Sequence, residues 1–267
     1  MGLRAPGHIR AGFTRTTAAA FLCAALVCGA ANANAQSQAG RPASDWEFRL
    51  TPYLWFAGFT GTVGAGGRTA DIDAPFRDVF DELNFGAMVN FEARKNRFTT
   101  LVDGFYVSLT DEKSISIPSG LNLKANSKTF VLNPDVGFRL LGGDKASVDF
   151  LTGIRYWHIK NSLEIESEVL PGAPEVSGSK DWVDPVLGAQ IGLKLPGRWR
   201  ARLQGDAGGF GAGSDLTWQV VASLGYELSN KTAVNAGYRY LDVDYRSGDF
   251  RFDTALSGFL LGVSFRF

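Results

Sequence analysis

The residues of this sequence that could do chemistry are mainly charged side chains that alternate with apolar ones. Nearly all of them are Arg, Asp or Glu. Arg pairs bidentately with carboxylates and is favoured where charges are partly withdrawn from water. The pattern predicts an enclosed interior in which opposite charges pair, or alternatively the lining of a small channel. The set comprises Arg49, Glu92, Arg94, Asp103, Asp135, Arg139, Asp149, Arg155, Asp184, Arg202, Asp206, Glu227 and Arg239.

His158 is a candidate general acid or base. Ser162 and Glu164 lie close to it in sequence, and Asp181 or Asp184 could approach it from the following segment. No catalytic motif surrounds His158, and a lone His near a strand end is more often an interfacial aromatic. We therefore expect no enzyme activity, and a hydrolase centred on His158 stays an alternative.

We expect no cofactor and no metal site built from Cys or His. Cys23 and Cys28 both lie in the N-terminal leader described below, and His158 alone is too few ligands for a His site. Carboxylates do gather in two prospective loops, where they could share divalent cations with lipopolysaccharide phosphates. These residues are Asp71, Asp73, Asp78, Asp81 and Glu82 in one loop and Glu164, Glu166 and Glu168 in the other.

The elements that would position these charges are strands, because apolar and polar residues alternate with a period of two from Trp46 to the last residue. The last segment, FLLGVSFRF, shows the pattern most clearly. We predict an all-β fold: a single transmembrane antiparallel up-and-down β-barrel of about ten strands, with about eight or about twelve left open. One apolar face of the last strand comprises Phe259, Leu261, Val263, Phe265 and Phe267.

Turn lengths predict the topology of such a barrel. Short turns near 96, 143, 197 and 230 alternate with longer or more variable connections at 60–82, 111–127, 162–180, 211–214 and 246–249. Short turns are typical of the periplasmic side, so both chain ends are expected there. The glycine-rich stretch from Gly208 to Asp215 predicts a tight bend, and backbone approach to a ligand at the outer mouth is the alternative.

Residues 1–35 have the features of a cleaved secretory signal peptide: basic residues, an apolar core and a small-residue cleavage site. We expect 36–45 to be a short periplasmic segment and 46–267 to be the barrel. The formal net charge is zero. This balance argues against a nucleic-acid partner.

The run with period two that ends on Phe267 resembles the C-terminal strand of bacterial outer-membrane β-barrels, whose final aromatic residue is part of the signal read by the barrel-assembly machinery. The chain resembles the small OmpA- and OmpW-type barrels of Gram-negative bacteria, and GYRYLDVDY at 237–245 is similar to a group of uncharacterised proteobacterial outer-membrane proteins. A soluble periplasmic sandwich is the alternative. Aromatic residues expected near strand ends as interfacial girdles are Trp46, Tyr53, Trp55, Tyr106, Tyr156, Trp157, Trp182, Trp199, Trp218, Tyr226, Tyr238 and Tyr240.

The resemblance implies location in the cell outer membrane, with lipid, lipopolysaccharide and the assembly machinery as partners. The leading functional hypothesis is a largely plugged barrel with a structural or surface-interaction role, because paired Arg side chains would fill a narrow lumen. The first alternative is a small passive channel lined by Arg155, Arg239, Asp184 and Asp206. The second is the rim hydrolase that uses His158.

Overall fold

The computed structural model describes residues 46–65, 68–115, 121–167 and 176–267. The predicted signal peptide and the segment 36–45 lie outside the described residues, as does Glu168. The described residues all belong to one compact unit, Ser44–Phe267. No helix in the described ranges is long and apolar enough to cross a bilayer.

Almost all of the described chain is β-strand, joined by short connections and one short helix. The helix α1 spans Phe76–Asp81. The strands are β1 (Trp46–Ala65), β2 (Arg68–Ala74), β3 (Leu83–Lys95), β4 (Phe98–Ile115), β5 (Leu121–Gly142), β6 (Ala146–Ser167), β7 (Val176–Lys194), β8 (Trp199–Gly208), β9 (Leu216–Glu227), β10 (Thr232–Ser247) and β11 (Phe250–Arg266).

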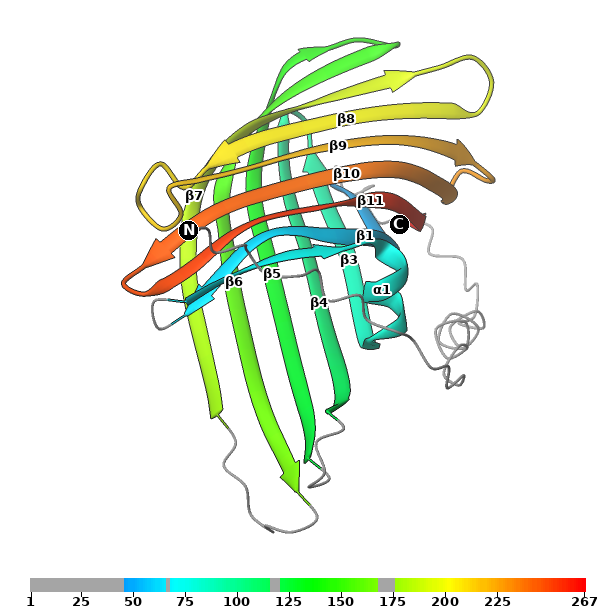
Figure 1. The fold of residues 1–267 in the computed structure, drawn as a ribbon. Coiled ribbons are helices and arrows are strands. Elements are labelled where there is room, and N and C mark those ends of the chain that lie inside the picture. The colour runs from blue at the N-terminus through cyan, green and yellow to red at the C-terminus, as the bar shows by residue number, and fades with distance from the viewer. Residues whose placement is uncertain (1–45, 66–67, 116–120, 168–175) are drawn as a thin grey trace, which may run out of the picture. The chain divides into compact units, whose positions relative to one another are not determined.

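The strands form a closed antiparallel barrel (Figure 1). From β3 to β11 each strand pairs with its neighbour in sequence, and β11 also pairs with β1, with Leu54 opposite Leu261. Backbone hydrogen bonds of 3.1 and 3.2 Å between Phe48 and Phe267 extend the β1–β11 pairing to the last residue. The prediction of a ten-stranded up-and-down barrel is confirmed, with β2 as an eleventh strand outside the set of ten.

The prediction of a loop at 60–82 is wrong, because this segment forms β2 and α1. The inner half of β1 pairs with β3 as far as Pro52, whereas its outer half, Phe59–Ala65, pairs with β2. The helix then packs on the barrel wall, where the Phe76 ring lies 5.2 Å from that of Phe56. The alternation in Arg68–Ala74 was a strand signal that the nearby glycines obscured.

The two ends of the barrel differ in their connections. At the short-turn end, defined by the connections at 96–97, 143–145, 195–198 and 228–231, neighbouring strands join directly, and Asn96 adopts a positive φ of 53° in one of these turns. At the opposite, long-loop end, β4 to β7 continue well past the other strands (Figure 1). The described parts of 111–127 and 162–180, which were predicted as long or variable connections, are strand, with Ile115 paired to Leu121.

The outward face of the barrel is apolar. Phe259 is 69% exposed, and Leu54, Phe98 and Leu261 are also exposed. A soluble protein rarely leaves so much contiguous apolar surface in water, whereas a bilayer covers it. Exposed large apolar side chains include Leu50, Phe85, Val89, Val136, Leu140, Ile154, Leu187, Leu203, Val220 and Leu224.

The predicted aromatic girdles are partly wrong. Tyr53, Trp55, Trp157 and Trp182 belong to the interior apolar cluster and do not face lipid. Their position near strand ends suggested a girdle. The face of the strand on which a side chain lies is set by alternation, and each of these residues is an even number of positions from an inward charge, as Trp157 is from Arg155.

Candidate functional site: the barrel interior

The charges predicted for the lumen come from alternate positions of the barrel strands, which direct them inward. They lie in two zones: a cavity at the short-turn end and a buried middle layer. Of the predicted set, the cavity is lined by Arg49, Glu92, Arg94, Asp103, Asp135, Arg139, Arg202, Glu227 and Arg239. Asp149, Arg155, Asp184 and Asp206 are the remaining members of the set, and the first three are almost fully buried.

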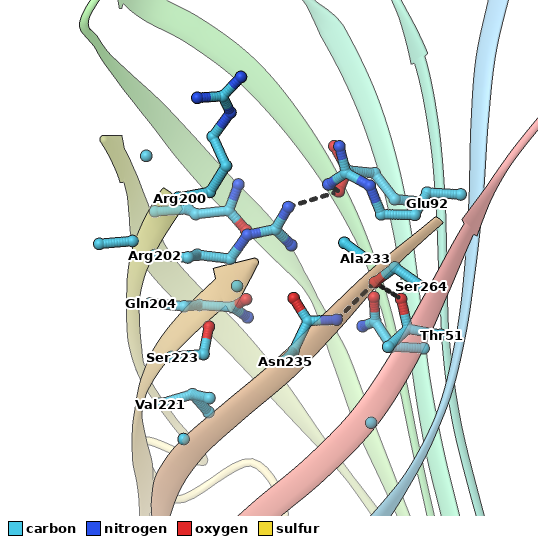
Figure 2. Close-up of a pocket in the computed structure, with 18 of the residues that line it drawn as sticks. Thr51, Glu92, Arg200, Arg202, Gln204, Val221, Ser223, Ala233, Asn235 and Ser264 are labelled. Atoms are coloured by element: carbon cyan, nitrogen blue, oxygen red, sulfur yellow. Dashed lines mark hydrogen bonds and ion pairs between the residues drawn. The ribbon is translucent and has the colours of Figure 1, made fainter. Parts of the chain in front are cut away.

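The cavity has a volume of about 570 Å³. Residues of the short turns, Lys145 and Lys231 among them, line it, so it opens at the short-turn end. Arg202 reaches across the space to Glu92 (Figure 2). Neutral side chains supply further polar atoms to the cavity wall. The Ser264 hydroxyl lies 2.8 Å from the Thr51 hydroxyl and accepts a 2.8 Å hydrogen bond from the Asn235 amide.

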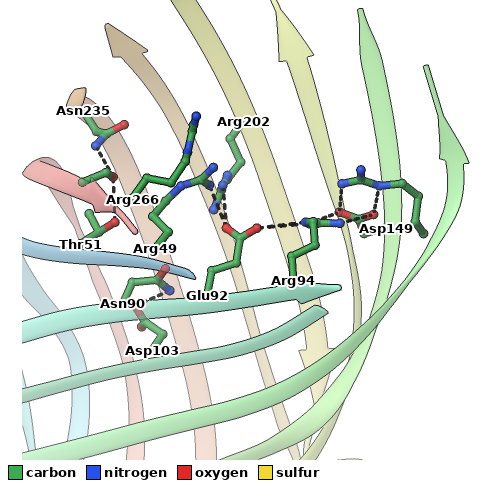
Figure 3. A network of polar contacts seen from close by, with 12 residues as sticks. Arg49, Thr51, Asn90, Glu92, Arg94, Asp103, Asp149, Arg202, Asn235 and Arg266 are labelled. Atoms are coloured by element: carbon green, nitrogen blue, oxygen red, sulfur yellow. Dashed lines mark hydrogen bonds and ion pairs between the residues drawn. The ribbon is translucent and has the colours of Figure 1, made fainter. Parts of the chain in front are cut away.

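Glu92 is the central carboxylate of this cavity (Figure 3). It accepts hydrogen bonds from Arg49 at 2.9 Å, Arg202 at 3.0 Å and Arg94 at 3.2 Å. Arg94 also donates to Asp149 at 2.9 Å. One carboxylate therefore has three guanidinium neighbours, which join strands β1, β3 and β8 through a single point.

Two further carboxylates continue the network. Asp149 also accepts a 2.8 Å bond from Arg139. Glu227 faces Arg200 at 3.0 Å and Arg266 at 3.5 Å. Glu92, Asp149 and Glu227 are thus each shared by more than one Arg.

Arg155 is the centre of the middle layer and is fully buried. It donates to Asp206 at 2.6 Å, to the Asn133 amide oxygen at 2.6 Å and to the Thr217 hydroxyl at 2.8 Å. Gln219 donates a further 2.6 Å bond to Asp206. These neutral partners were not singled out from the sequence, although each lies at an inward position of its strand.

Arg239 forms the second half of the middle layer. Its Nη1 donates to Asp103 at 2.9 Å and to the Tyr53 hydroxyl at 3.1 Å. The guanidinium carbon lies 4.8 Å from the Trp55 ring centroid and 5.4 Å from that of Phe105. Cation–π contacts of this kind favour an Arg that is withdrawn from water. The side chain therefore joins the charged zone to the apolar zone above it.

The long-loop half of the interior is filled by an aromatic cluster. Trp157 stacks on Trp182 at 5.4 Å between centroids, and Trp182 stacks on Tyr245 at 4.0 Å. Phe252 packs edge-on against both indoles. All four side chains are buried. The alternating pattern predicted charged side chains throughout the lumen, whereas its long-loop half is filled by apolar rings.

Asp184 has a different environment from the one predicted. We expected a salt-bridged or channel-lining carboxylate, but among the described residues its partners are neutral. The Ser214 backbone N–H and hydroxyl donate to it at 2.6 and 2.8 Å, and the indole N–H groups of Trp157 and Trp182 donate at 3.1 and 3.2 Å. Asp184 is 0% exposed within this shell of donors.

The same contacts account for the glycine-rich turn between β8 and β9. A Cβ at Gly213 would lie 2.5 Å from the Val183 carbonyl oxygen and 2.6 Å from Asp184 Oδ1. Gly209 and Gly211 adopt φ values of 85° and 77°, which favour glycine. A tight bend is what the sequence predicted, and the group that its backbone approaches is the chain's own Asp184.

His158 lies on the outer wall of the barrel, at a position that alternates with the inward Trp157. Its Nδ1 is 2.7 Å from Asp181 Oδ1, which also accepts a 2.5 Å bond from the Tyr156 hydroxyl. No serine hydroxyl in the described ranges forms a hydrogen bond with His158. Of the expected partners whose side chains the structure describes, Ser162, Asp181 and Asp184, only Asp181 contacts it, and the side chain of Glu164 lies outside the described part.

The acidic residues of the first loop, Asp71 to Glu82, are not gathered into a metal site, and the side chains of Glu164, Glu166 and Glu168 lie outside the described part of the chain. Within the described ranges no three His, Cys, Asp or Glu side chains are close enough together to hold an ion. Asp71 accepts a 2.7 Å hydrogen bond from the Thr62 hydroxyl across the β1–β2 hairpin. The sharing of divalent cations with lipopolysaccharide stays a prediction.

No protein-family model and no curated protein matches the sequence. Among solved structures, the outer membrane protease OmpT from Escherichia coli is similar, with a TM-score of 0.54 over 83% of this chain and 96% of OmpT, at 8% identity. The fold is that of an outer-membrane β-barrel. At this identity the likeness extends to the fold alone.

Two other outer-membrane barrels are more distant. The translocator domain of autotransporter NalP from Neisseria meningitidis has a TM-score of 0.42 and 14% identity, over 83% of this chain and 88% of that one. Ail of Yersinia pestis, solved with a heparin analogue, has a TM-score of 0.36 and 14% identity, over 83% of this chain and 98% of that one. Neither bears on the function of this chain.

Proposed function

We propose that this outer-membrane β-barrel is a closed, non-conducting protein with a structural or surface-interaction role. The observation that carries the proposal is the stacked cluster of Trp157, Trp182, Tyr245 and Phe252, which occupies the lumen at the long-loop half. A solute would have to pass through the space that these rings fill.

Opening this cluster would be costly. Exposing a large apolar side chain to water costs about 1.5–3 kcal/mol, so displacing Trp157, Trp182 and Tyr245 together would cost on the order of 5–9 kcal/mol. A free-energy difference of about 4 kcal/mol already holds the open state to roughly one molecule in a thousand. We therefore favour the closed barrel over the passive channel lined by Arg155, Arg239, Asp184 and Asp206.

The long strands β4 to β7 at the long-loop end support the surface-interaction role. Strands β4 to β7 pair with one another far past the ends of β8 to β10, as in the register of Leu163 opposite Val176. Short turns of membrane barrels face the periplasm, so this sheet would stand outside the cell. It offers an extended, hydrogen-bonded platform for contact with lipopolysaccharide or another surface.

We propose no enzymatic role. His158 and Asp181 lie on the outer wall, and neither borders the cavity. A hydrolase at this rim would need a nucleophile or an activated water beside His158. The purified protein is therefore expected to hydrolyse neither peptides nor lipid A, and hydrolysis that is lost in His158→Ala would overturn this part of the proposal.

Planar-bilayer recording tests the closed state. We expect no discrete conductance steps from the wild-type protein, whereas the double variant Trp182→Ala, Tyr245→Ala should conduct because it removes two stacked rings. The matched control is Trp218→Ala with Tyr240→Ala, a stacked pair on the outer wall, which should stay silent. Reproducible steps from the wild type would contradict the proposal.

A further inference from the structure

We propose that the cavity at the short-turn end binds a small, multiply charged anion through its carboxylate or phosphate oxygens. This inference goes beyond the proposed function and does not depend on it. Binding from one side requires an open cavity at that end only, and binding is measured without conductance.

The first observation is an excess of guanidinium groups. Three carboxylates, Glu92 and Glu227 in the cavity lining and Asp149 beside it, are shared by a larger number of Arg side chains. The Arg residues that contact them are Arg49, Arg94, Arg139, Arg200, Arg202 and Arg266. Two cations per carboxylate leave a net positive charge around the cavity. That charge repels itself unless further anions are present.

The second observation is that the Glu92 and Asp149 carboxylates are buried while the Arg side chains around Glu92 are partly exposed. The Glu92 and Asp149 side chains are 5% and 1% exposed, whereas those of Arg49 and Arg202 are 26% and 30% exposed. Each guanidinium has five N–H donors. Arg49 and Arg202 each use one nitrogen for Glu92, Nη1 and Nη2 respectively. The remaining donors are available to a ligand in the cavity.

Lysines at the opening add to this field. Lys145, Lys194 and Lys231 line the cavity and make no ion pair with any residue that the structure describes. Among the described residues, the acidic ones that line the cavity are Glu47, Glu92, Glu227 and the deeper Asp103 and Asp135. An anion that approaches from the short-turn side therefore meets a positive rim before it reaches the arginines.

The size and lining of the cavity define the class of ligand. Its volume of about 570 Å³ is within the range of about 300–1,000 Å³ usual for small-molecule sites. Asn90, Gln204, Ser223 and Asn235 offer neutral hydrogen-bonding groups along the walls. A ligand with two or more negative charges and several oxygen acceptors would satisfy both the arginines and these groups. A monovalent anion would neutralise too little of the excess charge.

Isothermal titration of the full barrel in a neutral detergent tests the proposal, with citrate and inorganic pyrophosphate as probes and acetate as the monovalent comparison. We expect saturable binding of at least one multivalent probe with a stoichiometry of about one, and much weaker binding of acetate. The affinity should fall as salt is raised, because the interaction is electrostatic.

The variant Arg202→Gln should weaken binding about tenfold or more, the usual effect of losing one charge-assisted hydrogen bond. Glu92 keeps Arg49 and Arg94 in this variant. Lys231→Gln, at an exposed turn, should weaken binding a few-fold without any effect on folding. The matched control is Arg246→Gln, which removes the same charge at the long-loop end, where Arg246 pairs with Asp244.

Three results would overturn the proposal. The first is the absence of saturable heat with both citrate and pyrophosphate at low salt. The second is binding of acetate as strong as that of the multivalent probes. The third is an equal loss of affinity in Arg246→Gln and in both cavity variants, which would indicate a general charge effect and no site in the cavity.

Discussion

At the scale of single residues, Asp184 shows how a buried carboxylate is accommodated without a salt bridge. Ser214 and two indole N–H groups supply its donors. The sequence allowed the prediction that Asp184 faces inward, because it lies on the polar face of an alternating strand. It could not give the neutral shell, since Ser214 comes from a turn and Trp157 from another strand, and their approach to Asp184 depends on the closed barrel.

We predict that Asp184→Asn destabilises the barrel by about 1–3 kcal/mol, because the amide NH2 would face the indole N–H groups and leave donors unpaired in a buried site. The measurement is equilibrium unfolding in urea, followed by β-sheet circular dichroism. The control is Asp181→Asn on the outer wall, where water can replace lost contacts, and the expected change is within about 0.5 kcal/mol. Equal destabilisation of the two variants would contradict the account.

At the scale of elements, the alternation of inward and outward residues along each strand explains which predictions were right. The inward charges were assigned by strand parity, and the structure places them at the cavity or in the buried layers. The indoles of Trp157 and Trp182 were assigned by their position near strand ends, and that assignment was wrong. The hairpin β1–β2 was not predicted, because its second strand is a short alternating segment that follows several glycines. Periodicity is local, whereas the filling of the lumen depends on contacts between distant strands.

The last strand makes a separate prediction about assembly. Phe267 is 65% exposed and so contributes little to the packing of the finished barrel. If the assembly machinery reads the outward row Phe259, Leu261, Val263, Phe265 and Phe267, Phe267→Ala should reduce the amount of folded protein in the outer membrane. The stability of the barrel refolded in detergent should be nearly unchanged.

Phe98→Ala is the matched control for this effect, because Phe98 is also 65% exposed and lies beside a short turn. The measurement is the heat-sensitive gel mobility of outer-membrane fractions, together with unfolding of the refolded proteins. Normal assembly of Phe267→Ala, or an equal defect in Phe98→Ala, would contradict the prediction that Phe267 belongs to the assembly signal.

At the scale of the whole barrel, the interior is divided along its axis. The short-turn half contains a cavity lined by many Arg side chains, and the long-loop half contains stacked aromatic rings. The sequence predicted a plugged lumen filled by charge, and it could not reveal the division, because the two halves are built from alternate residues of the same strands. The central claim is that this barrel is open to water from one end only.

Thiol accessibility in oriented proteoliposomes tests that claim most directly, because residues 36–267 contain no cysteine. Single variants Ser223→Cys in the cavity wall and Asp249→Cys at the long-loop end would be exposed to a membrane-impermeant thiol reagent added to one side at a time. We predict that Ser223→Cys reacts only from the short-turn side and Asp249→Cys only from the long-loop side. Reaction of Ser223→Cys from the long-loop side would contradict the account.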